Sequence, residues 1–343
     1  MSSVVVSSMR NEGAFLLEWV CWYRMLGFDH IVVVTNDCTD HSPELLDALA
    51  RAGWVEHLTV DIKAGQAGIT AAKLAAASQM RTVRRAEHVL VCDVDEFLVI
   101  HVGDGRLPAL LAAPGRGFLG MAINWRCIGS SGVRKYVDLP VHQQFTVAIG
   151  PKRPFNRFIK TLYGHPRWFA RMGEHGPIGL KLTKAQEKAG MVWGQGDLVW
   201  VTPAGHVMTE WQPGGDYLRQ VATRRIDHSV AQMNHYILRS AESFGLKRGT
   251  LSPVAGRNRY TQGFWTQADR RDGFDDSALR YGADYAQMRA MAMALPDVAR
   301  LHGLCCADHV RLIADKADLR VLDDPRYLAF LAQSRLDDPG QVG

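Results

Sequence analysis

The first hundred residues alternate between short apolar runs and longer segments in which apolar residues recur every three or four positions. Four compact runs have the composition of buried strands: residues 4–7, 31–34, 54–60 and 88–92. Three amphipathic segments lie between them and are typical of helices: residues 15–26, 42–50 and 69–85, the second opened by Ser42 as N-cap and Pro43. This order requires parallel strand pairing with helices on both faces. We therefore expect an α/β fold with a mainly parallel sheet, which binds ligands beyond the carboxyl ends of its strands.

The pattern changes beyond about residue 115. Residues 118–123 are predicted to form a strand and 125–132 a loop, and residues 133–212 mix short strands with Gly and Pro turns. After about residue 239 the chain reads as mainly helical, with helices near 240–247, 283–295, 306–317 and 325–334. We find no linker or repeat. The expected organisation is a catalytic domain over 1–240, with a nucleotide half (1–115) and an acceptor half (116–240), and a helical extension over 241–343 packed on it.

Charge and composition exclude some functional classes. The net charge of +5 suits an anionic ligand such as a nucleotide diphosphate, without specifying one. No run of five or more basic residues suggests a nucleic-acid-binding arm, so we expect no nucleic-acid partner. The hydrophobic content of 47% is enough for a sizeable core in a chain of 343 residues.

Cysteine usage and the apolar runs bear on the compartment. No C-x-x-C pair is present, which argues against a zinc ribbon. Cys21, Cys92 and Cys127 lie in apolar or aromatic surroundings and are expected to be buried, reduced thiols, as in a reducing compartment. The N-terminus lacks the pattern of a signal peptide, and every apolar run is too short to cross a bilayer. We expect a soluble, cytoplasmic protein that could be peripheral to a membrane.

An acidic cluster, Asp93-Val94-Asp95-Glu96-Phe97, follows the fourth strand. Two carboxylates at positions i and i+2 point to the same side of an extended chain and suit Mg²⁺ or Mn²⁺. Such a cation neutralises the charge that develops on a diphosphate leaving group. A D-x-D tripeptide occurs by chance about once in a chain of this size, so its place at a strand end carries the argument. Glu96 alternates to the other face and is expected to be a structural hydrogen-bond acceptor.

Several separated motifs, in order, resemble the family 2-like and family 92-like glycosyltransferases. The matching segments are residues 9–19 (MRNEGAFLLEW), 34–40 (VTNDCTD), 93–98 (DVDEFL), 128–132 (IGSSG), 234–240 (NHYILRS) and 244–249 (FGLKRG). Two departures occur: Ile128 replaces a Phe of the family motif, and one residue fewer than expected lies between Lys247 and Gly249.

The resemblance implies a GT-A type fold and an inverting hexosyltransferase. The donor would be a nucleotide diphosphate sugar, expected to be UDP-linked, and the acceptor a glycan, a lipid or another hydroxyl compound. By position, the base and ribose would be held by Met9, Asn11, Glu12, Asn36 and Asp37. Asp95 would be the direct ligand of Mn²⁺ or Mg²⁺, Asp93 would contact the metal or the ribose, and His235 would be a late ligand of the metal.

Simpler structural explanations stand beside several of these roles. Asn11 and Glu12 could cap a helix, and Asp37 and Asp40 could form an Asx turn and cap a helix. His235 could be a hydrogen-bonded core histidine. Lys73 could reach donor phosphates or be a solvated helical lysine. Lys247 and Arg248 could clamp the diphosphate or face solvent.

The acceptor side is less determined by the sequence. The Q-x-x-R-W element of processive synthases is absent and cannot locate the general base. Glu174, beside His175 in a Gly-bounded loop, is the first choice for that base and Asp197 the second. Trp125, with Trp193 and Trp211 as weaker candidates, could be a platform for acceptor sugars or a packing anchor.

The sequence leaves two other functions open. A sugar nucleotidyltransferase would normally carry a Gly-rich, Arg- or Lys-bearing signature after the first strand, and residues 9–14 do not read that way. A non-catalytic module that binds nucleotide sugars or glycans would bind these ligands without turnover.

Overall fold

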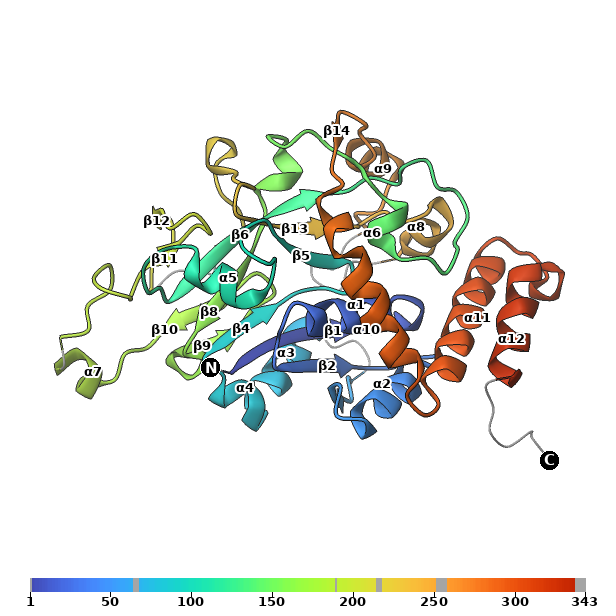
Figure 1. Ribbon diagram of the computed structural model, residues 1–343, viewed down its shortest axis with the longest axis horizontal. Coiled ribbons are helices and arrows are strands. Elements are labelled where there is room, and N and C mark those ends of the chain that lie inside the picture. The colour runs from blue at the N-terminus through green and yellow to red at the C-terminus, as the bar shows by residue number, and fades with distance from the viewer. Residues whose placement is uncertain (1, 64–67, 189, 214–217, 251–257, 337–343) are drawn as a thin grey trace.

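The computed structural model describes residues 2–63, 68–188, 190–213, 218–250 and 258–336 (Figure 1). Its centre is a ten-stranded sheet with the path β12-β11-β6-β8-β4-β1-β2-β3, and β13 and β5 join it at β6. The strands are β1 (Ser3–Met9), β2 (His30–Thr35), β3 (Glu56–Thr59), β4 (His88–Val91), β5 (Glu96–Ile100), β6 (Gly120–Cys127), β8 (Ile159–Gly164), β11 (Trp200–Val201), β12 (Val207–Met208) and β13 (Ala231–His235).

The first four strands pair in parallel, as the sequence predicts. β1 lies between β2 and β4, and β3 follows β2 at the edge. Side chains alternate between the two faces: Val5 and Val33 pack into one hydrophobic cluster, whereas Val4 and Val6 pack into another. Because both of their faces are covered, β1, β2 and β4 are apolar at most positions, whereas the edge strand β3 is polar and partly exposed.

Helices cover both faces of the parallel strands. α1 (Gly13–Met25) and α2 (Ser42–Arg51) carry residues of the first cluster, and α3 (Ile69–Gln79) and α4 (Arg81–Arg85) carry residues of the second. The mainly parallel sheet, flanked by helices and followed by a helical C-terminal region, confirms the expected fold class.

Three local predictions were wrong. The helix expected over residues 69–85 is interrupted at Met80, whose extended ψ of 138° separates α3 from α4. The loop expected from Trp125 begins later, because β6 continues to Cys127, where it pairs with β13. The N-cap of α2 is His41 rather than Ser42. In the first two cases the tertiary contacts decide the element boundary, which local propensity cannot.

The C-terminal region consists mainly of helices and wraps back onto the sheet (Figure 1). α11 and α12 form a hairpin, and α11 also contacts α1, α2 and α8, while α10 packs on α1. A short strand, β14 (Gly273–Phe274), pairs with β7 (Val147–Ala148) inside the stretch expected to be helical. The helices of the C-terminal region are α8 (Ala241–Lys247), α9 (Gln262–Ala268), α10 (Gly282–Met293), α11 (Val298–Lys316) and α12 (Pro325–Leu336). The domain boundary at residue 240 stays a prediction.

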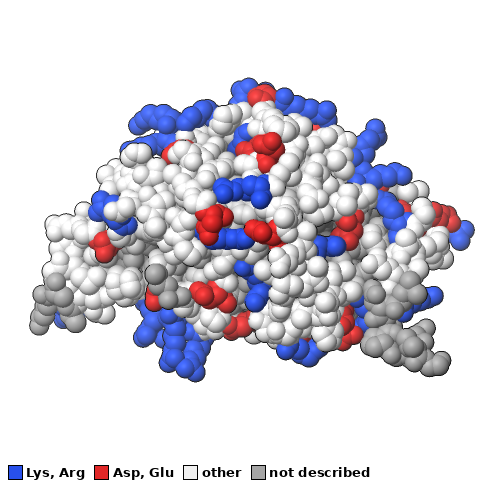
Figure 2. Space-filling model, in the orientation of Figure 1, with Lys and Arg blue, Asp and Glu red and all other residues white. Residues whose placement is uncertain are grey.

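All six cysteines are unpaired, and Cys21, Cys92 and Cys127 are buried as predicted. Within the described ranges, no helix combines the length and apolar character needed to span a bilayer. Figure 2 shows basic and acidic side chains mixed over one face, with basic side chains gathered at the lower left, near α4. Arg81, Arg84 and Arg85 of that helix are exposed.

Candidate functional site

The polar segments predicted to bind the donor all follow strands that run in one direction. β1, β2 and β4 are parallel, β6 runs the same way because β8 is antiparallel to both β4 and β6, and β13 is parallel to β6. The carboxyl ends of these strands therefore lie along one edge of the sheet. That edge carries the loops at residues 10–12, 36–40 and 92–95 and the end of β13 at His235.

Asp95 lies at the centre of this edge and is almost fully buried. Its Oδ2 accepts a hydrogen bond from Lys247 Nζ at 2.9 Å, and its Oδ1 lies 3.5 Å from His235 Nε2. Burial alone would raise the pKa of Asp95, but Lys247 and His235 hold it well below its usual range. Asp95 is therefore a carboxylate at neutral pH.

Asp95 and His235 fit a divalent cation as two of its ligands. Ligands at ~2.1 Å from a metal and roughly 100° apart are separated by about 3.2 Å, close to the Oδ1–Nε2 distance of 3.5 Å. Burial lowers the pKa of His235, which favours the neutral imidazole that binds metals. Its Nδ1 is buried without a hydrogen-bond partner among the described residues. These two side chains leave most of a coordination shell to phosphate oxygens and water.

Asp93 has different neighbours from Asp95. Its side chain is 49% exposed, and Oδ2 lies 3.1 Å from Lys160 Nζ. The same Nζ is 2.8 Å from Glu96 Oε2, and Glu96 is fully buried. Glu96 Oε2 also accepts from the Asp93 backbone N–H, as expected for a structural acceptor. Lys160 thus fixes Asp93 and neutralises the inner carboxylate, while the outer face of Asp93 stays open.

The two buried members of this group have shifted pKa values. Burial raises the pKa of Glu96 above its ordinary value, and the charge of Lys160 opposes this shift. Burial also opposes the charge of Lys160, but Asp93 and Glu96 together keep its pKa above the ordinary value.

The loops after β1 and β2 are tied together. Asn11 Nδ2 donates to Thr39 Oγ1 at 2.9 Å, and the Thr39 backbone N–H donates to Asn11 Oδ1 at 2.8 Å. Both Asn11 and Asp37 have positive φ, at 54° and 43°. Asn36 Nδ2 donates to Asp37 Oδ2, which leaves the buried Asn36 Oδ1 without a partner among the described residues.

Glu12 stands at the N-cap position of α1 but makes no side-chain capping hydrogen bond. The capping role belongs to Asp40, which accepts from the Gly13 backbone N–H at 3.1 Å. Glu12 Oε2 instead pairs with Arg239 Nη1 at 2.9 Å. The capping explanation for Glu12 is therefore wrong, and its carboxylate is directed toward the residues after β13.

Lys73 is buried on α3 rather than solvated. Its Nζ donates to the Met9 carbonyl at 3.0 Å, at the end of β1. Burial lowers its pKa to about 8. The end of β1 therefore holds its ammonium group beside the loop at residues 10–12.

On the acceptor side, Glu174 is partly buried near Asp93, and its backbone carbonyl accepts from Lys160 Nζ at 3.0 Å. Burial and then the charge of Asp93 raise its pKa. Trp125 is buried, with its ring centroid 4.2 Å from that of His235 and 5.6 Å from that of His175. Trp125 is thus part of the wall beside the metal-ligand candidate.

The remaining residues that the sequence predicts for the donor and acceptor sides lie away from Asp95 or face solvent. Asp197 is exposed and packs against Gly117, before the amino ends of β11 and β6 and so at the opposite edge of the sheet. Trp211 is buried in a stack on Trp200, with Trp193 against it. Arg248 is exposed beyond α8, whereas its neighbour Lys247 turns inward.

Sequence reasoning missed Lys160 and Arg239. Lys160 is a lone basic residue in the otherwise apolar start of β8, an unusual position that could have singled it out. Arg239 occupies the basic position of the motif at residues 234–240, but the motif alone predicts no role for it. It is buried, has a positive φ of 53°, and stacks on Phe15 at 3.5 Å. Its Nε and Nη2 are buried and have no hydrogen-bond partner within the described ranges.

Known proteins offer little guidance. No protein-family model and no curated protein matches the chain. Among solved structures, S. aureus TarS is 10% identical, covers 98% of this chain and 53% of its own, and has a TM-score of 0.34. The structure of S. aureus TarS 1-349 is 11% identical, covers 98% of this chain and 88% of its own, and scores 0.32. A protein assigned as a glucose-1-phosphate thymidylyltransferase from Bacillus anthracis is 11% identical, covers 48% and 72%, and scores 0.29.

The chain thus spans about half the length of the longer TarS structure. Likenesses this weak carry no argument about activity.

Proposed function

We propose that the chain is a GT-A type glycosyltransferase of the hexosyltransferase class. It would move a sugar from a nucleotide diphosphate donor, a UDP-sugar, to a hydroxyl group of a glycan, a lipid or another acceptor, with inversion. The observation that carries the proposal is the approach of Asp95 Oδ1 to His235 Nε2 at 3.5 Å. It brings together a carboxylate from the loop after β4 and an imidazole from the end of β13, two side chains of the kinds that bind metals, at the carboxyl edge of an α/β sheet.

The surrounding charges suit a diphosphate. Lys73, Lys247 and Arg239 lie around this edge, and the unpartnered Arg239 nitrogens point to an anionic ligand. A Mn²⁺ or Mg²⁺ ion held by Asp95 and His235 would neutralise charge on the leaving group. Lys247 contacts only Oδ2 of Asp95, so Oδ1 is the oxygen that such an ion would take.

Asn11, Asn36 and Asp37, with Met9 and Glu12 beside them, are proposed to hold the base and ribose. The buried Asn36 Oδ1 can accept from a base N–H, and the open face of Asp93 can accept from a ribose hydroxyl. Arg248, which is exposed, contributes to donor binding only if the diphosphate reaches beyond α8.

Glu174 is proposed as the general base. Its raised pKa moves it toward neutrality, where a carboxylate is a better proton acceptor. The acceptor oxygen would form a bond to the anomeric carbon and give its proton to Glu174, while the sugar–phosphate bond breaks and the diphosphate keeps the electron pair. Trp125 is proposed to shape the acceptor side.

The test combines binding with product analysis. The purified chain is screened by thermal shift with UDP, GDP and dTDP and their sugars, with Mn²⁺ or with EDTA. We expect a uridine diphosphate to raise Tm more strongly with Mn²⁺. Turnover should release the nucleoside diphosphate and form a glycoside. Release of pyrophosphate from a nucleoside triphosphate and a sugar 1-phosphate, tested in parallel, would instead indicate a nucleotidyltransferase. Binding without turnover over a broad acceptor panel would indicate a binding module.

Asp95→Asn should abolish transfer and Mn²⁺-dependent binding while the protein stays folded. Asp197→Asn makes the same chemical change at the opposite edge of the sheet and serves as the matched control. Full activity of Asp95→Asn with added Mn²⁺ would contradict the metal assignment.

A further inference from the structure

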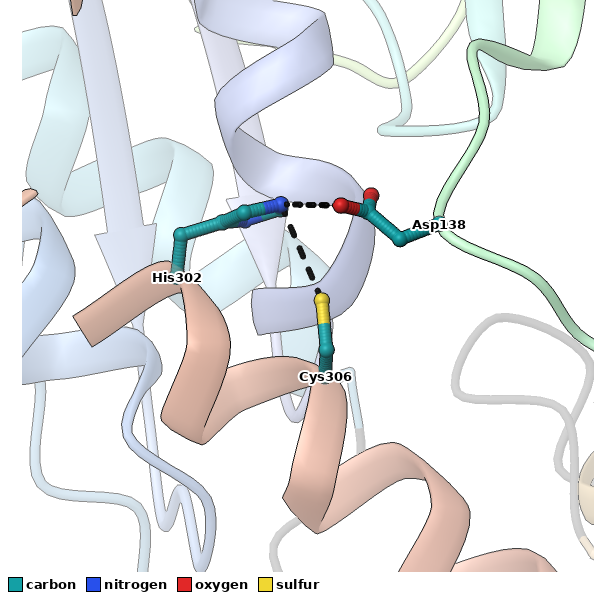
Figure 3. Close-up of side chains that lie close together, drawn as sticks. All are labelled: Asp138, His302 and Cys306. Atoms are coloured by element: carbon teal, nitrogen blue, oxygen red, sulfur yellow. Dashed lines mark hydrogen bonds and ion pairs between the residues drawn. The ribbon is translucent and has the colours of Figure 1, made fainter. Parts of the chain in front are cut away.

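A second group of reactive side chains lies outside the donor site, between α11 and the loop before α6 (Val141–Gln144). His302 and Cys306 are four residues apart on α11 and so share one face of the helix. Both point toward Asp138 in the loop (Figure 3). His302 Nε2 is 3.1 Å from Asp138 Oδ2 and 3.7 Å from Cys306 Sγ. Within the described part of the chain, these three form the only group of possible metal ligands whose atoms all lie within 4.8 Å of one another.

The sulfur of Cys306 has two polar neighbours, Tyr136 and His302. Tyr136 Oη donates a hydrogen bond to Cys306 Sγ at 3.2 Å, which stabilises negative charge on sulfur. Cys306 and His302 are buried, so a thiolate here needs a cation beside it. The structure thus places two potential anions, Asp138 and Cys306, on either side of one imidazole nitrogen.

The hydrogen bonding at His302 Nε2 is in conflict. Arg289 Nη2 lies 3.3 Å from Nε2 and can only donate, which requires the lone pair of that nitrogen. Asp138 lies 3.1 Å from the same atom and, when ionised, can only accept, which requires a proton there. One nitrogen cannot do both, and only Arg289 has a second partner, because its Nη2 also donates to Asp138 Oδ2 at 3.0 Å. When Nε2 carries a lone pair, the lone pairs of Asp138 Oδ2, His302 Nε2 and Cys306 Sγ lie close together and repel one another. A cation between the three atoms would remove this repulsion.

Both distances from His302 Nε2 are close to those between zinc ligands. Zn–N and Zn–O bonds of ~2.0 Å and a Zn–S bond of ~2.3 Å, at tetrahedral angles, separate N from O by about 3.3 Å and N from S by about 3.5 Å. The observed distances are 3.1 and 3.7 Å. A small cavity of about 10 Å³, lined in part by Asp138, Arg289 and His302, adjoins the group. It has room for about one water molecule.

We propose that Asp138, His302 and Cys306 bind Zn²⁺ through Oδ2, Nε2 and Sγ, with a water molecule from the adjoining cavity as the fourth ligand. A thiolate, an imidazole and a carboxylate form a donor set that zinc prefers over Mg²⁺ or Ca²⁺. Binding releases the thiol proton of Cys306 to solvent. When the ion is bound, Arg289 Nη2 donates to Asp138 and no longer to His302 Nε2. The ion joins α11 to the loop at Asp138 and so fastens the C-terminal helices to the sheet domain.

Cobalt substitution tests the site directly. The full chain is stripped with EDTA, desalted and titrated with Co²⁺, which is expected to give a thiolate-to-cobalt charge-transfer band that Zn²⁺ then displaces. Asp95 and His235 offer no sulfur, so a cation at the donor site cannot produce this band. The result is therefore independent of the proposed glycosyltransferase activity.

Cys306→Ser should lose the charge-transfer band, and Cys305→Ser should keep it. Cys305 is the matched control because it is a buried thiol on the same helix that packs against Gly13 instead. If Cys306→Ser fails to fold by circular dichroism, Asp138→Asn, in a partly exposed loop position, replaces it and should weaken Co²⁺ binding at least tenfold. The proposal is overturned if the wild type gives no charge-transfer band, if that band survives in Cys306→Ser, or if Asp138→Asn binds Co²⁺ as the wild type does.

Discussion

Lys247 Nζ donates a hydrogen bond to Asp95 Oδ2 at 2.9 Å, joining α8 to the loop after β4 across 152 residues of sequence. Lys247 is mostly buried and also donates to the Ile237 carbonyl at 3.3 Å. The contact ties the acidic cluster to the C-terminal region, so the proposed donor site and the packing of α8 depend on each other.

Lys247→Met should therefore destabilise the protein, because it leaves the Asp95 carboxylate buried beside His235 alone. We expect a loss of about 2 kcal/mol in the free energy of unfolding, measured with urea. Arg248→Met removes an exposed neighbouring charge and should change this free energy by less than ~0.5 kcal/mol. Equal effects of the two substitutions would show that the Lys247–Asp95 contact contributes nothing.

Lys160→Met should lower the free energy of unfolding more than Lys247→Met does, because it leaves Glu96 fully buried without its cation. Breaking a buried ion pair costs roughly 3–5 kcal/mol. The double variant Lys160→Met with Glu96→Gln should recover part of this loss, since the uncompensated charge is then gone. Urea unfolding of the two single variants and the double variant gives the coupling energy, and strict additivity would contradict the pairing.

Glu174→Gln tests the general base under the proposed activity. We expect kcat to fall by about 10²–10⁴-fold, the usual contribution of a positioned base. The thermal shift produced by UDP should stay unchanged, because the donor loops are intact. A variant that keeps its kcat would exclude Glu174 from the proton transfer.

His309 should make stability depend on pH. It is buried on α11, its Nε2 lies 3.0 Å from Ser243 Oγ, and burial lowers its pKa to about 3. The unfolded chain binds a proton near pH 6.5 and the folded chain does not, so this contribution is fully present above that pH. It is lost as the pH falls toward 3, by at most about 1.4 kcal/mol per pH unit.

Urea unfolding between pH 7 and 4 measures the slope. His309→Gln should flatten it, whereas His30→Gln, at an exposed position, should not. A His309→Gln slope equal to that of the wild type would contradict the assignment.

Gly120→Ala tests the close approach of Trp200 to β6. A Cβ at Gly120 would overlap the Trp200 ring, which is itself stacked on Trp211 with centroids 4.2 Å apart. Overpacking of this kind should destabilise the fold by about 1–3 kcal/mol. Gly245→Ala, where a Cβ meets nothing within 4 Å in helix α8, should be neutral or stabilising by up to about 1 kcal/mol. Calorimetry on both variants measures these two changes in stability, and equal changes would contradict the close packing at Gly120.

The regular part of the fold could be predicted because its signals are local. The apolar runs at residues 4–7, 31–34 and 88–92 and the periodic segments between them specify strands and helices directly. Parallel pairing then follows from the order of elements. The helix break at Met80 and the extension of β6 could not be predicted, because contacts with distant segments decide them.

The sequence by itself determined the α/β architecture and the position of Asp93 and Asp95 at a strand end, since both follow from periodicity along the chain. Only the tertiary structure decided which charges meet: Lys160 with Asp93 and Glu96, Lys247 with Asp95, and Arg239 with Glu12. These partners are far apart in sequence, and a lone lysine or arginine carries no local mark of its partner. Buried charges are stable only when paired, so the fold, rather than any motif, selects the pairs.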